Sequence, residues 1–258
     1  MPTTFSPLKT ITALAIAGAL GLPGLPALAW DWTPGKVVLG SGQVIKTQRQ
    51  LSGFKGLALE LPASVEIVQG DTEGVLIETD DNIAPLIETV VENEQLKIRP
   101  TRRFTAFKTK TTRITIHARS MDNISISGSG EVKAQKLQSS ALATQISGSG
   151  DIHIATLDVD TLSVSISGNG DFQASGRADS VQTSIAGSGN IKTARLAAKN
   201  VKLSIAGSGN AQVWANQTLS ISIAGSGNVD YHGDATVSQS VMGSGRIRKV
   251  AATANPGS

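Results

Sequence analysis

Apolar and polar residues alternate in short groups along the C-terminal half of the chain. In residues 151–168 the apolar positions are Ile152 and Ile154, then Leu157 and Val159, then Leu162, Val164 and Ile166. Alternation with a period of two is typical of a strand that buries one face, and its phase slips by one residue between groups. A slip is expected where the chain turns a corner. We therefore predict three short strands per unit that wrap once around a shared core.

A glycine motif recurs in step with this alternation. The octapeptide SISGSGEV at residues 125–132 returns six times in related forms, and the steps between copies are 20, 20, 19, 20, 18 and 18 residues. So regular a period is the signature of a solenoid. Because the units alternate like strands, we predict an all-β fold. It is a single-stranded parallel β-helix (solenoid) with about seven coils of 18–20 residues, preceded by a β-rich capping region.

Each copy of the motif contributes two glycines at a fixed place in its coil. They are Gly128 and Gly130, Gly148 and Gly150, Gly168 and Gly170, Gly187 and Gly189, Gly207 and Gly209, Gly225 and Gly227, and Gly243 and Gly245. If the strand runs straight through the motif, both glycines face a narrow interior. If it bends there, glycine supplies a positive φ or a bulge that other residues resist. We favour the bend, and both explanations make these residues structural turn glycines.

Outward positions beside the glycines should form ladders. One level reads Ser129, Ser149, Asn169, Ser188, Ser208, Ser226 and Ser244, and the next reads Glu131, Asp151, Asp171, Asn190, Asn210, Asn228 and Arg246. Stacked asparagines and serines can hydrogen-bond from coil to coil. The three stacked carboxylates could instead bind calcium or act as an acid pair on sugars. We favour a solvated edge, because the position becomes asparagine in the next three units.

The rest of the chain divides into segments of different composition. Residues 1–29 carry one charge, Lys9, before an apolar run and end in Ala-Leu-Ala, which predicts a secretory signal peptide. The further segments are a lead-in at 30–48, a β-rich N-terminal cap region at 49–118, the parallel β-helix repeats at 119–250 and a flexible tail at 251–258. A cap is expected because an end coil exposes an unpaired strand edge.

Composition narrows the class of protein further. The chain has no cysteine, so a continuous core rather than disulfides must hold it together after export. The formal charge of +3 falls to +2 without Lys9, which is too small for a typical nucleic-acid binder. After the signal peptide no segment has the length of a transmembrane helix. We therefore expect no nucleic-acid partner and no transmembrane segment in the mature chain.

The cap region and the repeats together resemble a known family. The segments that carry the resemblance are QRQLSGFKG, the VQG turn, the TDDN segment, the strand TRITIHA and the serial GSG turns, over roughly residues 49–245. They are similar to the putative auto-transporter adhesin head, GIN domain family of exported bacterial proteins. The resemblance implies a β-helical fold, an exported location in the periplasm or at the cell surface, and a conjectured role in adhesion.

The most uneven stretch is residues 98–113, IRPTRRFTAFKTKTTR, which carries six cations and two phenylalanines. Such a loop could contact anionic polysaccharide, lipopolysaccharide or phospholipid head groups. The candidate contacts are Arg102, Arg103, Lys108 and Lys110. The alternative is an ordinary solvated hairpin, which the sequence does not distinguish from a binding loop.

Other candidate chemistry is weaker. His232 lies between Asp230 and Asp234 and could hold a metal, but a polar loop is a commoner explanation. Trp214 and Tyr231 are on neighbouring units and could come together, although a core role for either is as reasonable. Because no acid, base or nucleophile stands out from the repeats, we predict no catalytic residue, no cofactor and no metal site.

Three functions remain open from the sequence. The preferred one is an exported, non-enzymatic interaction or adhesion-type surface whose partner is a polysaccharide, lipopolysaccharide or another envelope protein. The second is a polysaccharide-active enzyme on a β-helix, which requires non-repeated acids and bases on adjacent coils. The third is a purely structural envelope protein. Neither the ligand nor the oligomeric state follows from the sequence.

Overall fold

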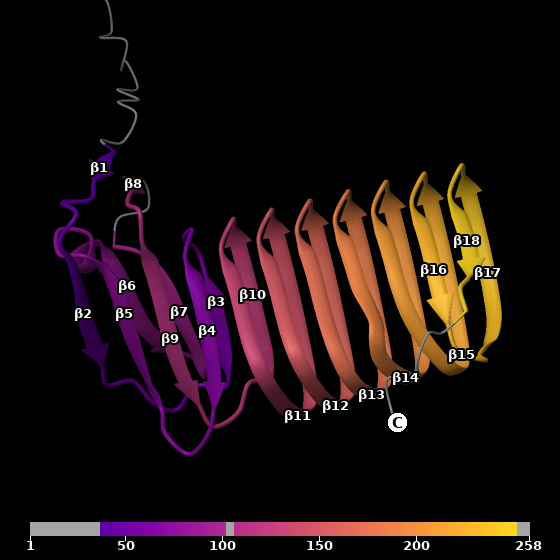
Figure 1. The fold of residues 1–258 in the computed structure, drawn as a ribbon, viewed down its shortest axis with the longest axis horizontal. Coiled ribbons are helices and arrows are strands. Elements are labelled where there is room, and N and C mark those ends of the chain that lie inside the picture. Colours follow the sequence, from indigo (N-terminus) through magenta and orange to yellow (C-terminus); the bar gives the residue numbers. More distant parts are fainter. Residues whose placement is uncertain (1–36, 102–105, 252–258) are drawn as a thin grey trace, which may run out of the picture. The chain divides into compact units, whose positions relative to one another are not determined.

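The computed structural model describes residues 37–101 and 106–251 (Figure 1). The all-β expectation is confirmed, because strands and one short 3-10 helix, η1 (Ala84–Leu86), are the only regular elements of the described residues. The C-terminal part holds nine strands: β10 (Asn123–Gly128), β11 (Glu131–Gly148), β12 (Asp151–Gly168), β13 (Asp171–Gly187), β14 (Asn190–Gly207), β15 (Asn210–Gly225), β16 (Asn228–His232), β17 (Thr236–Gly243) and β18 (Arg246–Lys249). Each pairs in parallel with the equivalent part of the next coil.

Each full coil is one long strand that bends, rather than three separate strands. The ladder between β11 and β12 runs over 131–134, 136–139 and 141–148, and it skips one residue at each of two corners. The burial pattern changes phase at the same two places, as the sequence alternation predicts. We call these three stretches of each coil its first, second and third face. The third corner is the Gly-x-Gly motif itself.

The stack has about six turns rather than seven. The seven Gly-x-Gly corners enclose only six intervals, so counting corners overstates the number of turns by one. Coils of unequal length still stack in register because the difference is absorbed at the second face. The register of β12 against β13 shifts between Ile154 and Leu157, and Gly176 takes a φ of +124° opposite Leu157.

The two glycines of the motif have different roles. The first glycine has a positive φ, between +116° and +136° over the seven copies, so the favoured bend is confirmed there. The second glycine faces the interior. At Gly150 a Cβ would lie 2.6 Å from the Ile126 side chain and 2.7 Å from the Gly130 carbonyl oxygen. Both explanations from the sequence therefore hold, one for each glycine.

The N-terminal part extends two of the three faces. Its strands are β1 (Val38–Leu39), β2 (Val44–Arg49), β3 (Gly56–Leu59), β4 (Ser64–Gln69), β5 (Gly74–Asp80), β6 (Ile87–Glu92), β7 (Gln95–Pro100), β8 (Phe107–Lys108) and β9 (Thr112–Ala118). On the first face the order is β11-β4-β9-β5-β2, and on the third face it is β10-β3-β7-β6. The order of the strands in space therefore differs from their order in the chain. β3 lies between β10 and β7, and β4 lies between β11 and β9.

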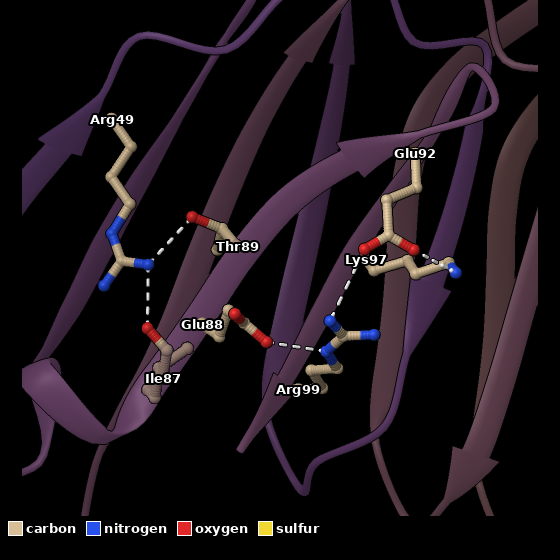
Figure 2. A network of polar contacts seen from close by, with 7 residues as sticks. All are labelled: Arg49, Ile87, Glu88, Thr89, Glu92, Lys97 and Arg99. Carbon is tan, nitrogen blue, oxygen red and sulfur yellow. Dashed lines mark hydrogen bonds and ion pairs between the residues drawn. The ribbon is translucent and has the colours of Figure 1, made fainter. Parts of the chain in front are cut away.

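Both extended faces end in antiparallel strands. β5 and β2 finish the first face and β6 finishes the third. The side chain of Arg49, at the end of β2, joins the two ends. Its guanidinium donates to the Ile87 carbonyl at 2.7 Å and to the Thr89 hydroxyl at 2.8 Å (Figure 2). Partial burial lowers the pKa of Arg49.

Candidate functional site: a basic groove beside the first coil

An open groove lies where the loop after β8 faces the first Gly-x-Gly corner. Its volume is about 520 Å³. One wall carries Lys108, Lys110 and Arg113 together with Phe107, and the other carries Ser64, Ser129 and Glu131. We call this the basic groove. It brings two residues of the predicted anionic-ligand set together with polar residues of the first coils.

The TDDN segment fixes the loop that carries the groove lysines. The carboxylate of Asp80, only 4% exposed, accepts the Thr109 hydroxyl at 2.6 Å and the Gly42 amide at 3.2 Å. The Thr111 amide donates to the Thr109 hydroxyl at 3.2 Å. Because Lys108 and Lys110 flank Thr109, their backbone positions depend on this buried contact. The sequence singled out the TDDN segment but gave it no role.

The lead-in before β2 is part of the same support. β1 pairs in parallel with β8, and the Gly40 amide donates to the Lys108 carbonyl at 2.9 Å. Asn82 fastens this lead-in from the other side by donating to the Leu39 carbonyl at 2.8 Å and accepting the Ser41 amide at 2.9 Å. The groove lysines are therefore held between the TDDN segment and residues 38–42.

The groove lysines carry charge that their surroundings do not neutralise. Lys108 and Lys110 are exposed and form no ion pair with another described residue. Arg113 lies 3.8 Å from Glu78, which also approaches Lys46 at 3.5 Å. Glu131 at the opposite wall pairs with Lys133 at 2.7 Å. The groove therefore offers cations on one wall and a paired carboxylate with hydroxyls on the other.

The remaining cations of residues 98–113 are Arg99, which lies in the described part of the chain beside Lys97, and the pair Arg102 and Arg103. Arg99 is committed to the hairpin of β6 and β7, because it donates to Glu88 at 2.7 Å and approaches Glu92 at 3.5 Å (Figure 2). The hydrogen bond and the charge of Glu88 raise the pKa of Arg99. Lys97 donates to Glu92 at 2.6 Å, and this bond lowers the pKa of Glu92. Arg102 and Arg103 lie outside the described residues.

The Glu131 level forms a hydrogen-bonded ladder for part of its length. Asn190 donates to Asp171 at 2.7 Å, Asn210 to Asn190 at 3.2 Å, and Asn228 to Asn210 at 3.1 Å. The amide ladder predicted from the sequence is thus present. At the Ser129 level the backbone amides join one coil to the next, as where Ser149 donates to the Gly128 carbonyl at 2.9 Å.

The carboxylates of this ladder are engaged with donors from the protein. Asp151 accepts the backbone amide of Asp171 at 2.9 Å, and Asp171 accepts Lys192 at 2.6 Å. Partial burial of Asp171 raises its pKa, but the hydrogen bonds from Lys192 and Asn190 outweigh burial and lower it overall. Within the described ranges no three or more His, Cys, Asp or Glu side chains gather closely enough to hold a metal ion.

The surroundings of His232 also differ from those expected of a metal site formed with Asp230 and Asp234. Its two acidic neighbours are paired elsewhere, Asp230 with Arg248 at 3.0 Å and Asp234 with Lys249 at 3.1 Å. The His232 ring stacks on Trp214 with centroids 5.6 Å apart. Trp214 therefore meets His232 rather than Tyr231. It is 6% exposed and donates to Asn216, but it lies outside the cluster of buried core residues that includes its neighbours Val213 and Ala215.

Comparison with known proteins places this architecture in a family. The family model described as putative auto-transporter adhesin, head GIN domain, matches residues 53–235. The chain belongs to this GIN domain family. The family resemblance noted from the sequence is thereby confirmed. A search of curated proteins found no match.

Solved structures share the fold of this GIN-domain chain. A putative adhesin from Bacteroides fragilis NCTC 9343 is 25% identical, with a TM-score of 0.77 over 83% of this chain and all of that one. A putative lipid binding protein from Parabacteroides distasonis ATCC 8503 is 26% identical, with a TM-score of 0.70 and the same two coverages. A putative adhesin from the same strain is 20% identical, with a TM-score of 0.67 and the same coverages, and shows the fold alone.

The family and its adhesin relatives support an adhesion-type role for this GIN-domain chain. No helix among residues 37–101 and 106–251 has the length and apolar character needed to span a bilayer. The predicted signal peptide at residues 1–29 lies outside the described part of the chain.

Proposed function

We propose that this GIN-domain protein is an exported, non-enzymatic adhesion protein of the cell envelope that binds anionic polysaccharide in its basic groove. One observation carries the proposal. Lys108 and Lys110 are held at a groove wall by a buried hydrogen-bond network, yet form no ion pair with the described residues. Because an unneutralised cation on a fixed loop attracts anionic groups, the groove favours a negatively charged polymer.

The two walls fit different parts of a sugar chain. The ammonium groups of Lys108 and Lys110 can bind carboxylates or phosphates of the polymer. Glu131 and the hydroxyl of Ser129 can accept or donate hydrogen bonds to sugar hydroxyls. Half-buried Phe107 offers an apolar surface to a sugar ring. Polar ladders along the coils add weak contacts, and many weak contacts on one rigid body add through effective concentration.

A charge reversal with a matched control tests this function. Lys108→Glu with Lys110→Glu should weaken binding of the chain from Trp30 to immobilised polygalacturonate by at least ~10-fold, and added salt should weaken wild-type binding. Lys199→Glu with Lys202→Glu changes the net charge equally on exposed coil positions and should bind like wild type. Equal binding by all three proteins, or equal binding of neutral dextran, contradicts the proposal.

A lipid head group is the second candidate ligand. The solved structure at 26% identity is described as a putative lipid binding protein, and the same lysines could bind phosphate. Vesicles containing phosphatidylglycerol distinguish the two. Groove-dependent binding to vesicles but not to polygalacturonate favours lipid. Release of unsaturated sugar products from polygalacturonate would instead favour the enzymatic alternative.

Export has its own test. A signal peptide at residues 1–29 predicts that the protein recovered from the envelope or the medium begins near Trp30, which N-terminal sequencing measures. Recovery of the chain with residues 1–29 intact would contradict a cleaved signal.

A further inference from the structure

The coil stack ends at a strand with one described neighbour. On the third face β15 is the only strand among residues 37–101 and 106–251 that pairs with β17. Its inward positions Val237, Gln239 and Val241 continue the rows of buried Leu219, Ile221 and Ile223. Yet inward Val241 is 40% exposed, and Met242, on the outward side of the same strand, is 72% exposed. Met242 also stands where the other corners carry serine or alanine. The core of the third face is therefore uncovered at this end.

The other end strands carry charges that discourage pairing with another chain, and β17 carries none. β18 presents Arg246, Arg248 and Lys249. At the opposite end β6 contains Glu88 and Glu92, and β2 contains Lys46 and Arg49. The sequence of β17, TVSQSVMG, has no charge and no proline. A long neutral edge strand with β-branched residues is a template for another strand.

We propose that β17 pairs antiparallel with β17 of a second copy of this chain and forms a two-fold dimer. Directly opposed residues in an antiparallel pair share one face of the sheet. A register centred on Gln239 meets this condition. It places Val237 opposite Val241, Gln239 opposite itself, and Ser238 opposite Ser240. The valines of both copies then complete the exposed core, and the outward side of the new ladder is uncharged.

Charges beyond β17 also suit a second copy. The two-fold axis of the dimer is perpendicular to the shared sheet. The first face of one copy therefore lies on the same side as the second face of the other copy. The basic strand β18 of one copy then lies over residues 232–235 of the other. The side chain of Asp234 in that segment is 97% exposed although it lies 3.1 Å from Lys249 of its own chain, and Arg246 of β18 forms no ion pair with another described residue. Opposite charges therefore face each other where the two helical ends meet.

The dimer gives adhesion a second binding site, a consequence that rests on the proposed function. The basic groove contacts β4 and the first corner, whereas β17 belongs to the last coil. Joining two copies through β17 leaves both grooves open. Two grooves on one particle bind a polymer with higher avidity than one, provided that the polymer reaches both.

Charge placed on the outward side of β17 tests the register. Sedimentation of the chain from Trp30 should show a concentration-dependent dimer. Ser238→Lys with Ser240→Lys opposes lysines across the two-fold axis and should raise the dissociation constant about tenfold or more. The matched control is Ser220→Lys with Ser222→Lys on β15, which occupies the same exposed rows one coil earlier and should dimerise like wild type.

Mixing gives a rescue that a folding defect cannot imitate. A Ser238→Glu and Ser240→Glu variant should be monomeric alone and should form a mixed dimer with the lysine variant. Because the chain contains no cysteine, Gln239→Cys can also be oxidised to a disulfide between two directly opposed copies of this residue. It should link to a second copy, whereas Thr236→Cys, which faces Met242 in this register, should not.

Several outcomes overturn the dimer. They are a monomer at all concentrations, a dimer that the lysine variant leaves unchanged, and a monomer that dimerises only when residues 252–258 are removed, which would show that the tail covers the edge.

Binding of a short anionic oligosaccharide needs one groove only. A wild-type chain that stays monomeric but binds this oligosaccharide rejects the inference alone, whereas a wild-type dimer that does not bind it rejects the proposed function alone.

Discussion

The coil stack, residues 123–249, and the N-terminal part, residues 37–118, use parallel strands in different ways. In the coil stack each strand pairs with the equivalent part of an adjacent coil, and the repeated glycine corner keeps the coils in register. In the N-terminal part β3 and β4 separate strands that follow them in the chain, and long-range polar contacts hold the parts together. The repeated corner thus sets the strand pairing in the coil stack, whereas the arrangement of the N-terminal part depends on individual side-chain contacts.

The largest effect should come from the corner glycines. Gly148 has a φ of +123°, and an added Cβ would lie 2.6 Å from the Gly128 carbonyl oxygen. Gly148→Ala should therefore lower the free energy of unfolding by about 3 kcal/mol, measured by urea denaturation. Gly53 in the N-terminal part has a φ of +77° with no atom within 4 Å of the added Cβ. Gly53→Ala should cost only about 1 kcal/mol. Equal losses would remove the distinction between the regions.

The next effect should come from the buried carboxylate of the N-terminal part. Asp80→Ala leaves the Thr109 hydroxyl and the Gly42 amide without their acceptor. We expect a loss of about 2 kcal/mol in the free energy of unfolding and faster amide exchange at Gly40. Arg177→Ala in the coil stack breaks a surface ion pair with Asp158, and the expected loss is less than about half as large. A larger loss for Arg177→Ala would contradict the comparison.

A smaller effect is expected where the two regions join. β4 ends at Gln69, so on the side away from β12 no described strand pairs with the second face of β11. The Gln69 side chain replaces one by accepting the Gln138 amide at 2.8 Å and donating to the Gln138 carbonyl at 2.9 Å. Gln69→Ala should cost about 1 kcal/mol and speed exchange of the Gln138 amide. Gln145→Ala, at an exposed outward position of β11, is the control and should change neither.

The smallest effect concerns acid stability of the coil stack. Hydrogen bonds lower the folded-state pKa of Asp171 below its unfolded value, although partial burial acts against them. A lowered folded pKa contributes stability above the ordinary value of about 3.9, and this contribution is lost as the pH falls through the folded pKa. Asp171→Asn should therefore be less stable than wild type at pH 7, and the difference should shrink at pH 3. A constant difference in urea midpoint would contradict this assignment.

The repeat in the sequence determined the coil region almost completely. Period-two alternation, phase slips and the spacing of the glycine pairs specify strands, corners and register, because each coil meets a copy of itself. The asparagine ladder followed for the same reason. Even so, the different roles of Gly148 and Gly150 appeared only in the structure, since both satisfy the same local pattern.

Tertiary structure alone decided the order of strands in the N-terminal part and the composition of the basic groove. Nothing local in FKGLALELP requires β3 to lie between β10 and β7, because non-repeated strands can pair in many orders. The sequence identified Lys108 and Lys110 but not that Asp80 binds Thr109 between them or that Ser129 lines the same groove. Asp80 and Ser129 are distant from the lysines in the chain and come near them only after the strands are placed. In a repeat each strand packs against a copy of its own sequence, so the sequence specifies its neighbours. A site assembled from non-repeated segments depends instead on long-range packing.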